Sequence, residues 1–248
     1  MGVDVSLRGA AAVVTMRWPA QRNALGPEES SEVADALRTA AAEPNAAGVV
    51  LTGEGAFCAG GNLKGAASRQ DMPPEQRRTL VYGAYQGLIR TLVDLPVPTV
   101  AAVDGPAVGM GLDIALACDS RFVGPEGWVS QGWGKMSLAP ATGGALLLAL
   151  RAPNALWPLL ETQPRLDGPA AQAMGIAESS GSSTALERAV ARVENLAAMT
   201  RPALAAYAEL SRDLLRRHLD THLEAGLAHQ LGLLADPEFR NRVARTLS

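Results

Sequence analysis

Two glycine-rich stretches have the residue types and the placement to bind a polar group through the main chain. The first, GEGAFCAGGNLK at 53–64, follows a run of strand-forming residues. The second, GPAVGMGLD at 105–113, follows another such run and leads into an apolar helix. The first stretch lacks the last glycine of G-x-G-x-x-G and also lacks the G-K-[ST] of a P-loop, which argues against a phosphate site.

A carbonyl oxygen is the ligand that these stretches fit better. Glycine lets a carbonyl group approach the backbone closely, and an N–H group aimed at its oxygen stabilises the negative charge that develops there. The second stretch opens a helix, whose first N–H groups lack intrahelical partners. We therefore expect one N–H from each stretch to bind the same oxygen, with two ordinary tight turns as the alternative.

Asp113 is a carboxyl group within an otherwise apolar helix pattern. It lies one turn into the apolar helix, beside Leu112 and Ile114. Burial there disfavours the charged form and raises the pKa of a carboxyl group, which suits an acid or a base. Capping of the N-terminal amides of its own helix is the alternative role.

The surrounding pattern predicts an α/β protein with a helical C-terminal part. Strands are expected at residues 3–7, 12–17, 49–52, 99–103 and 120–123, and helices at 27–42, 75–93, 109–118, 145–150, 169–174, 184–198 and 202–234. Strands that alternate with helices indicate parallel pairing. No strand is expected in the last 100 residues, so the helices there should pack on the sheet or on another subunit.

Composition excludes several classes of function. The 248 residues carry a net charge of −3, which gives no electrostatic basis for binding nucleic acid. No apolar run is long enough to cross a membrane, and the first residues do not form a secretory signal, so we expect a cytoplasmic protein. His218 and His222 have a helical spacing, but no third ligand accompanies them and we expect no metal.

Four segments carry a family resemblance. They are RWPAQRNAL (17–25), GAFCAGGNLK (55–64), VPTVAAVDGPAVGMGLDIALACDSR (97–121) and RLDGPAAQAMGIAE (165–178). In order and spacing the sequence resembles the crotonase (enoyl-CoA hydratase/isomerase) superfamily over nearly its whole length. The resemblance implies a spiral of ββα units over residues 1–190 and a C-terminal helical region over 191–248. It also implies that this region mediates a homotrimer, or a homohexamer made of two trimers.

The resemblance implies roles for particular residues. Gly61 and Met110 match the two oxyanion-hole positions, whose backbone N–H groups polarise the carbonyl of an acyl-CoA thioester. Asp113 matches the first catalytic glutamate of the family's hydratases. Substrate or coenzyme A contacts are implied at Ala24, Ala59, Lys64, Trp133 and Pro140. Coenzyme A is then part of the substrate, and no separate cofactor is expected.

The sequence departs from the family at the second catalytic glutamate. Counting back from the proline at 140 reaches Trp133, whereas alignment on the preceding strand reaches Gln131, and neither is a carboxylate. Lys135 lies in the same stretch and is a further candidate, with a solvated loop lysine as the alternative. The end of the chain also stops before the usual phenylalanine and lysine, which leaves open a weaker hold on coenzyme A or an acyl group on a carrier protein.

Three functions follow from these observations. The first is hydration or isomerisation of an enoyl-CoA, with Asp113 as the main titrating group. The second keeps the oxyanion hole but performs decarboxylation, thioester hydrolysis or C–C bond cleavage. The third, from another class, is an acyl-thioester-binding protein without catalysis.

Overall fold

A six-stranded sheet forms the centre of the computed structural model, which describes residues 2–63, 65 and 72–247. Its strand order is β1-β2-β3-β4-β6-β8, and every neighbouring pair after the first is parallel. The strands are β1 (Gly2–Arg8), β2 (Ala11–Arg17), β3 (Gly48–Gly53), β4 (Thr99–Val103), β6 (Ser120–Val123) and β8 (Glu178–Ser179). A second sheet pairs β5 (Pro106–Val108) with β7 (Trp128–Ser130) in parallel.

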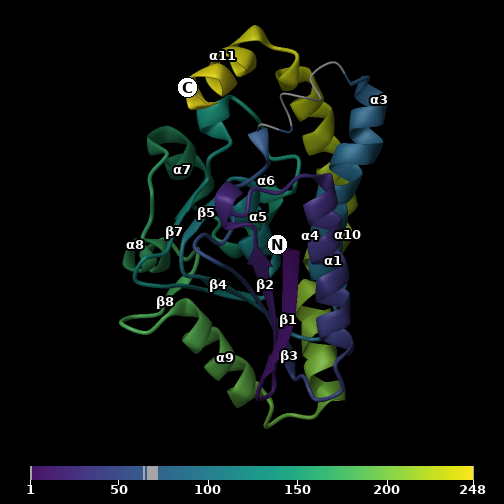
Figure 1. Cartoon of the computed structure of the whole chain (residues 1–248), viewed down its shortest axis with the longest axis vertical. Coiled ribbons are helices and arrows are strands. Elements are labelled where there is room, and N and C mark those ends of the chain that lie inside the picture. The colour runs from purple at the N-terminus through teal and green to yellow at the C-terminus, as the bar shows by residue number, and fades with distance from the viewer. Residues whose placement is uncertain (1, 64, 66–71, 248) are drawn as a thin grey trace.

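Helices cover both faces of the main sheet (Figure 1). The helices and helical turns are η1 (Pro19–Gln21), α1 (Pro27–Ala42), α3 (Pro74–Gln76), η2 (Arg77–Tyr82), α4 (Gly83–Asp94), α5 (Met110–Ala117), η3 (Gly134–Met136), α6 (Gly144–Arg151), α7 (Leu156–Thr162), α8 (Gly168–Ala173), α9 (Ala185–Leu196), α10 (Arg201–Leu234) and α11 (Pro237–Leu247). In the view of Figure 1, α1, α4 and α10 stand along one side, α9 lies below, and α11 lies at the top.

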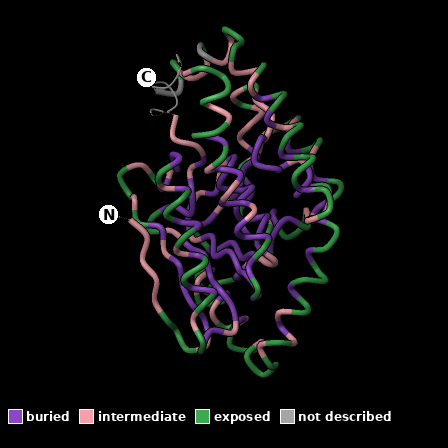
Figure 2. The backbone as a smooth tube through the Cα atoms, turned by 90° about the vertical axis from the view of Figure 1, so that its right-hand side faces the viewer, coloured by how far each residue is buried: buried purple, intermediate pink, exposed green. Residues whose placement is uncertain are grey.

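Alternate residues of each strand face opposite layers of the core. Val13, Val50 and Val100 pack against the apolar face of α9. Their sequence neighbours Val14 and Leu51 belong instead to the larger core with α1, α4 and α5. Parallel strands buried on both faces read as continuous apolar runs, which is how this sequence reads. Figure 2 shows the buried backbone gathered in the middle of the molecule.

Most of the expected elements are confirmed, with some corrections. The expected helix at 75–93 is one run of three segments, α3, η2 and α4, of which η2 is π-helical. The expectation of no strand in the last 100 residues is wrong, because β8 lies there, and β7 was also not among the expected strands. Strands β7 and β8 are short, at 3 and 2 residues, and so show no readable alternation. The proposed division at residue 190 falls within α9 and stays a prediction, as does the trimer.

A buried arginine fastens α10 to the rest of the fold. The side chain of Arg212 is fully buried, and its Nε donates to Asp119 Oδ1 over 2.7 Å. The same guanidinium donates to the carbonyl oxygens of Leu95 and Val97, in the turn between α4 and β4. Burial raises the pKa of Asp119 while the guanidinium of Arg212 lowers it, and the pKa is held below its usual value.

Replacing Arg212 with methionine should destabilise the fold strongly. The Asp119 carboxylate would lose its charged partner and keep only the donors of Thr99, and two carbonyl groups would lose the donor in a buried environment, at a cost of about 3–5 kcal/mol in the free energy of unfolding. Urea denaturation measures this cost. Arg217→Ala, which removes an exposed ion pair with Asp213 on the same helix, is the matched control and should cost under about 1 kcal/mol. Equal losses for the two variants would contradict the role given to Arg212.

Candidate active site

The two glycine-rich stretches lie side by side. They follow β3 and β4, which are neighbours in the sheet. The N–H of Cys58 donates to Pro106 O and that of Val108 donates to Cys58 O, each over 3.0 Å. These hydrogen bonds form an isolated parallel bridge between Cys58 and Ala107. The sequence therefore brings the stretches together through the ordinary pairing of adjacent parallel strands.

Glycine is required where the stretches touch. Gly60 has a φ of +101°, a conformation that other residues rarely adopt. A Cβ on Gly111 would lie 2.1 Å from Cys58 O, and one on Gly60 would lie 2.8 Å from Val108 O. The Cβ added to Gly60 would also lie 3.9 Å from the backbone nitrogen of Met110, which places the first stretch against the start of α5.

The N–H groups of Gly61 and Met110 make no hydrogen bond to any described residue. Met110 is the first residue of α5, so its N–H has no intrahelical acceptor. Gly60 O and Asn62 N both bond to Leu25. Gly61 N–H belongs to the same trans peptide group as Gly60 C=O, and the two point in opposite directions, so Gly61 N–H points away from Leu25. Both groups lie near the contact between the stretches, while their convergence on one oxygen stays a prediction.

The segment that carries Ala24 is held at this edge by a residue that was not expected to have a role, and the N–H of Ala59 donates to Arg22 O in the same segment. Asn23 is fully buried in a left-handed conformation, with φ at 52°. Its Oδ1 accepts from Trp18 N over 2.8 Å, and its Nδ2 donates to Ala56 O over 2.6 Å. The segment before α1 is thereby fixed to the glycine loop. The signal was present, because asparagine is among the residues that tolerate this conformation and bond locally.

The carboxyl group of Asp113 is buried and bonds to residues outside its own helix. Its side chain accepts from Trp133 Nε1 over 3.0 Å and from Thr142 Oγ1 over 2.5 Å, and both donors reach Oδ2. The helix-capping alternative is therefore wrong. Burial raises the pKa of Asp113 to about 7, while the two hydrogen bonds oppose that rise. A carboxyl group with this pKa can accept and return a proton near neutral pH.

Of the three residues considered for the second proton-transfer position, only Trp133 contacts Asp113. Its indole also lies next to Gly109, where an added Cβ would lie 3.8 Å from Trp133 Cε2. Gln131 is buried, and its Oε1 accepts from Gly134 N, so it supports the turn. Lys135 is exposed, which supports the solvated-lysine alternative, and its carbonyl accepts from Arg242.

The turn before α6 supplies Thr142, whose role was not predicted. Pro140 is half-buried and begins this turn, and Gly144 begins the helix. Ala141 is held from both sides, since its N–H donates to Gln230 Oε1 and its carbonyl accepts from Gln86 Nε2. Thr142 is therefore presented to Asp113 from a fixed backbone. A threonine just before a helix gave no distinctive signal in the sequence.

Other expectations concern residues with no described contact to Asp113. Lys64 lies outside the described residues. Within the described part of the chain, no cluster of three or more His, Cys, Asp or Glu side chains is arranged to bind a metal ion. In the same part of the chain, no helix combines the length and the apolar composition needed to cross a membrane.

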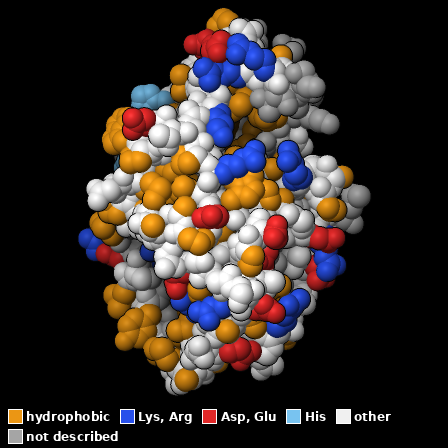
Figure 3. Space-filling model, turned by 90° about the vertical axis from the view of Figure 1, so that its left-hand side faces the viewer, with side chains coloured by type: hydrophobic (Ala, Val, Ile, Leu, Met, Phe, Trp, Pro, Cys, Tyr) orange, Lys and Arg blue, Asp and Glu red, His pale blue; other side chains and the backbone are white. Residues whose placement is uncertain are grey.

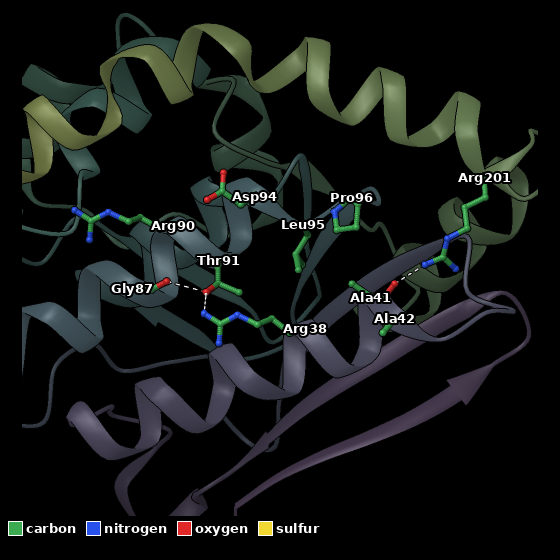
Figure 4. Close-up of a pocket in the computed structure, with 10 residues that line it drawn as sticks. All are labelled: Arg38, Ala41, Ala42, Gly87, Arg90, Thr91, Asp94, Leu95, Pro96 and Arg201. Carbon is green, nitrogen blue, oxygen red and sulfur yellow. Dashed lines mark hydrogen bonds between the residues drawn. The ribbon is translucent and has the colours of Figure 1, made fainter.

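Two hollows lie away from Asp113. The larger, of about 520 Å³, lies between α1, α4 and the start of α10 (Figure 4). Its arginines already have partners: Arg38 donates to Thr91, Arg90 pairs with Asp220, and Arg201 donates to carbonyls at the end of α1. The smaller, of about 260 Å³, lies beside β6 and α8. Neither is lined by the residues around Asp113.

Comparison with known proteins identifies the family. The family model for enoyl-CoA hydratase/isomerase matches residues 7–242. The chain belongs to the enoyl-CoA hydratase/isomerase family. It is 37% identical over 142 residues to "Probable enoyl-CoA hydratase EchA14" of Mycobacterium tuberculosis, a match that covers 57% of this chain and 54% of the relative. The chain thus spans about half the length of the first curated relatives that it matches.

Other relatives match over more of their length. "Enoyl-CoA hydratase domain-containing protein 2, mitochondrial" of Bos taurus is 31% identical, with 88% of this chain and 73% of the relative covered. A solved enoyl-CoA hydratase from Polaromonas is 29% identical, with a TM-score of 0.78 over 100% of this chain and 97% of that one. An enoyl-CoA hydratase structure from Bacillus halodurans, at 21% identity, has a TM-score of 0.90 over 99% of this chain and 100% of that one. The crotonase fold expected from the sequence is confirmed by these structures.

Replacing Gly144 with alanine should disturb Asp113. The added Cβ would lie 2.2 Å from Asp113 Oδ1, so the carboxyl group or α6 must shift. Such overpacking costs about 1–3 kcal/mol in unfolding free energy, which urea denaturation measures. Gly232→Ala in α10 is the matched control, because its Cβ would meet nothing within 4 Å. It should be neutral or stabilising by up to about 1 kcal/mol. Equal effects of the two substitutions would contradict the contact.

The pH dependence of stability should contain a contribution from Asp113. Its pKa rises from 3.8 to about 7 on folding, so the folded state holds the proton more tightly. This contribution is present below pH 4 and is lost as the pH rises to about 7, with a total on the order of 4 kcal/mol. Asp113→Asn should remove that part of the decline, as measured by urea denaturation at several pH values. Parallel curves for the variant and the wild type would contradict the shift.

Proposed function

We propose that this protein acts on enoyl thioesters of coenzyme A by stabilising an enolate. The observation that carries the proposal is Asp113, a buried carboxyl group with a pKa of about 7 on the helix that begins at Met110. The N–H groups of Met110 and Gly61 would bind the thioester oxygen as it gains negative charge. Losing one such donor typically costs about 10²–10³ in rate. Asp113 would move the proton.

Double-bond migration is the reaction that the site supports best. In a 3-enoyl thioester, the carboxylate of Asp113 takes the proton from the carbon next to the thioester and a dienolate forms. Asp113 then returns the proton to the γ carbon, and a conjugated 2-enoyl thioester results. One carboxyl group is enough for both transfers. Trp133, one of the residues matched to the position of the second family carboxylate, hydrogen-bonds Asp113 and is not itself a carboxylate.

Hydration is the second candidate, because the names of the two curated relatives described above, from Mycobacterium tuberculosis and Bos taurus, contain enoyl-CoA hydratase. With one carboxyl group, Asp113 would have to take a proton from the attacking water and also deliver a proton to the carbon next to the thioester. Decarboxylation, thioester hydrolysis and C–C bond cleavage need the oxyanion hole without a second acid or base, and they remain alternatives. A thioester-binding protein without catalysis is the alternative from another class.

The remaining roles follow from the same proposal. Ala24, Ala59 and Pro140 would line the path of the acyl group or the coenzyme, with Lys64 on the coenzyme A side. The face that carries α7 and α8 has Lys and Arg side chains beside hydrophobic ones, as Figure 3 shows, which suits a ligand with both phosphates and an acyl chain. Coenzyme A enters as part of the substrate, and the chemistry needs no other cofactor. We also propose a cytoplasmic homotrimer or homohexamer.

Asp113→Asn should abolish most turnover while acyl-CoA binding is retained. The amide is nearly isosteric but cannot take a proton, and proton transfer by a placed side chain contributes about 10²–10⁴-fold. Absorbance distinguishes the reactions, because 3-enoyl-CoA gains a conjugated chromophore on isomerisation whereas 2-enoyl-CoA loses it on hydration. Calorimetry measures binding, and Asp213→Asn on α10 is the matched control.

Each outcome of these assays has a definite meaning. Turnover of 3-enoyl-CoA that falls in Asp113→Asn supports isomerisation, and turnover of 2-enoyl-CoA alone supports hydration. Activity above about a tenth of wild type in Asp113→Asn would remove Asp113 from the mechanism. Binding without turnover of either substrate would point to the other reactions, which mass spectrometry of malonyl-type and β-diketone thioesters tests.

A further inference from the structure

Two neutral donors from different parts of the chain meet on one oxygen of Asp113. Trp133 Nε1 comes from the turn after β7, and Thr142 Oγ1 comes from the turn before α6. Both bond to Oδ2, at 3.0 and 2.5 Å. Oδ1 accepts no hydrogen bond from a described residue, so the two oxygens of this carboxyl group are not equivalent.

We infer that Thr142 and Trp133 are the positioning residues of Asp113, which keep Oδ2 as the acceptor and leave Oδ1 as the oxygen that carries the transferred proton. The inference rests on the proposed function, in which Asp113 is the acid and base. A carboxyl oxygen that already accepts two hydrogen bonds is a poor site for a proton. The neutral group is therefore protonated on the other oxygen.

The carboxyl group has little freedom to exchange its oxygens. Oδ1 lies against Gly144, where a Cβ would come within 2.2 Å. Rotation about the Cβ–Cγ bond of Asp113 would break both hydrogen bonds at Oδ2 in a buried environment. Unpaired buried donors cost about 1–3 kcal/mol each, so the observed orientation is favoured.

Each donor has its own support. Trp133 begins a turn in which its N–H donates to Gln131 O over 2.7 Å and its carbonyl accepts from Leu138 N over 3.0 Å. Thr142 is fully buried beside Ala141, whose main chain bonds to Gln86 and Gln230. The side chains are therefore preorganised, and neither depends on the other.

Burial raises the pKa of Asp113, and these two donors are what opposes that rise, since the described groups around it carry no opposite charge. Cys58, in the first glycine-rich stretch, interacts electrostatically with Asp113. Burial raises the pKa of its thiol to about 12, so the thiol is neutral. The charged residues of α4 point elsewhere: Arg90 pairs with Asp220 and Asp94 with Arg216. On α6 the charged side chain is Arg151, at the helix end opposite Gly144.

Thr142→Val tests the inference most cleanly, because it removes one donor and keeps the shape. Losing a hydrogen bond to the charged form raises the pKa of Asp113, so the acidic limb of the kcat profile should move to higher pH by about one pH unit. Thr142→Ser should restore the wild-type profile. Thr39→Val, on the exposed face of α1, is the matched control.

Trp133→Phe removes the other donor and should shift the same limb in the same direction. Trp157→Phe is its control, since Trp157 is 76% exposed on α7. Carbon NMR of the labelled carboxyl groups, with Asp113 assigned by its loss in Asp113→Asn, reads the titration without any substrate. Circular dichroism verifies that each variant is folded.

The outcomes separate this inference from the proposed function. A titration of Asp113 that is unchanged in folded Thr142→Val, or that Thr142→Ser fails to restore, overturns the positioning role even when Asp113→Asn is inactive. An active Asp113→Asn enzyme overturns the proposed function, while the NMR shift in Thr142→Val still tests the hydrogen bonds. A shift in both Thr142→Val and Trp133→Phe, together with inactive Asp113→Asn, supports both.

Discussion

The backbone of Cys58 lies against the backbone of Gly111 with no room for a side chain between them. This contact sets the distance between the glycine loop and α5, because Cys58 also pairs with Pro106 and Val108 just before that helix. The positions of the other groups at the site depend on this contact. The N–H of Met110, which bonds to no described residue, and the carboxyl group of Asp113 are carried by the first turn of α5, so their places follow once the loop and the helix are in contact.

Burial raises the pKa of Asp113, and two neutral donors limit that rise. Without them, desolvation alone would push the pKa still higher and leave little carboxylate at neutral pH. An arginine or lysine in their place would hold the pKa of Asp113 low, so that almost no protonated carboxyl group would be present near neutral pH. A tryptophan and a threonine lie between these limits, because they stabilise the charge through hydrogen bonds and add no charge of their own.

The sequence predicted the parts of the fold that depend on local pattern. The long strands and α1 lie where apolar periodicity placed them, and the apolar neighbours of Asp113, which the family resemblance singled out, correctly indicated its burial. The bonds between distant segments could not be read in this way. Thr142 reaches Asp113 across 29 positions and Trp133 across 20, and no rule of spacing links them. Trp133 was noticed as a missing carboxylate, but its indole N–H as a partner of Asp113 was not.

The turn that carries Thr142 is supported in part by α10, which is synthesised after it. Gln86 bonds both Ala141 O and Leu223 O, and Gln230 joins Ala141 N to the hydroxyl of Tyr82. The bonds that involve Leu223 and Gln230 close only when α10 is present, and contacts between segments so far apart in the sequence form slowly compared with local structure. During synthesis, the paired glycine loops can therefore assemble while the support of Thr142 is still missing. If the proposed function holds, a nascent chain would form the loops that bind the thioester oxygen well before it completes the support of Asp113.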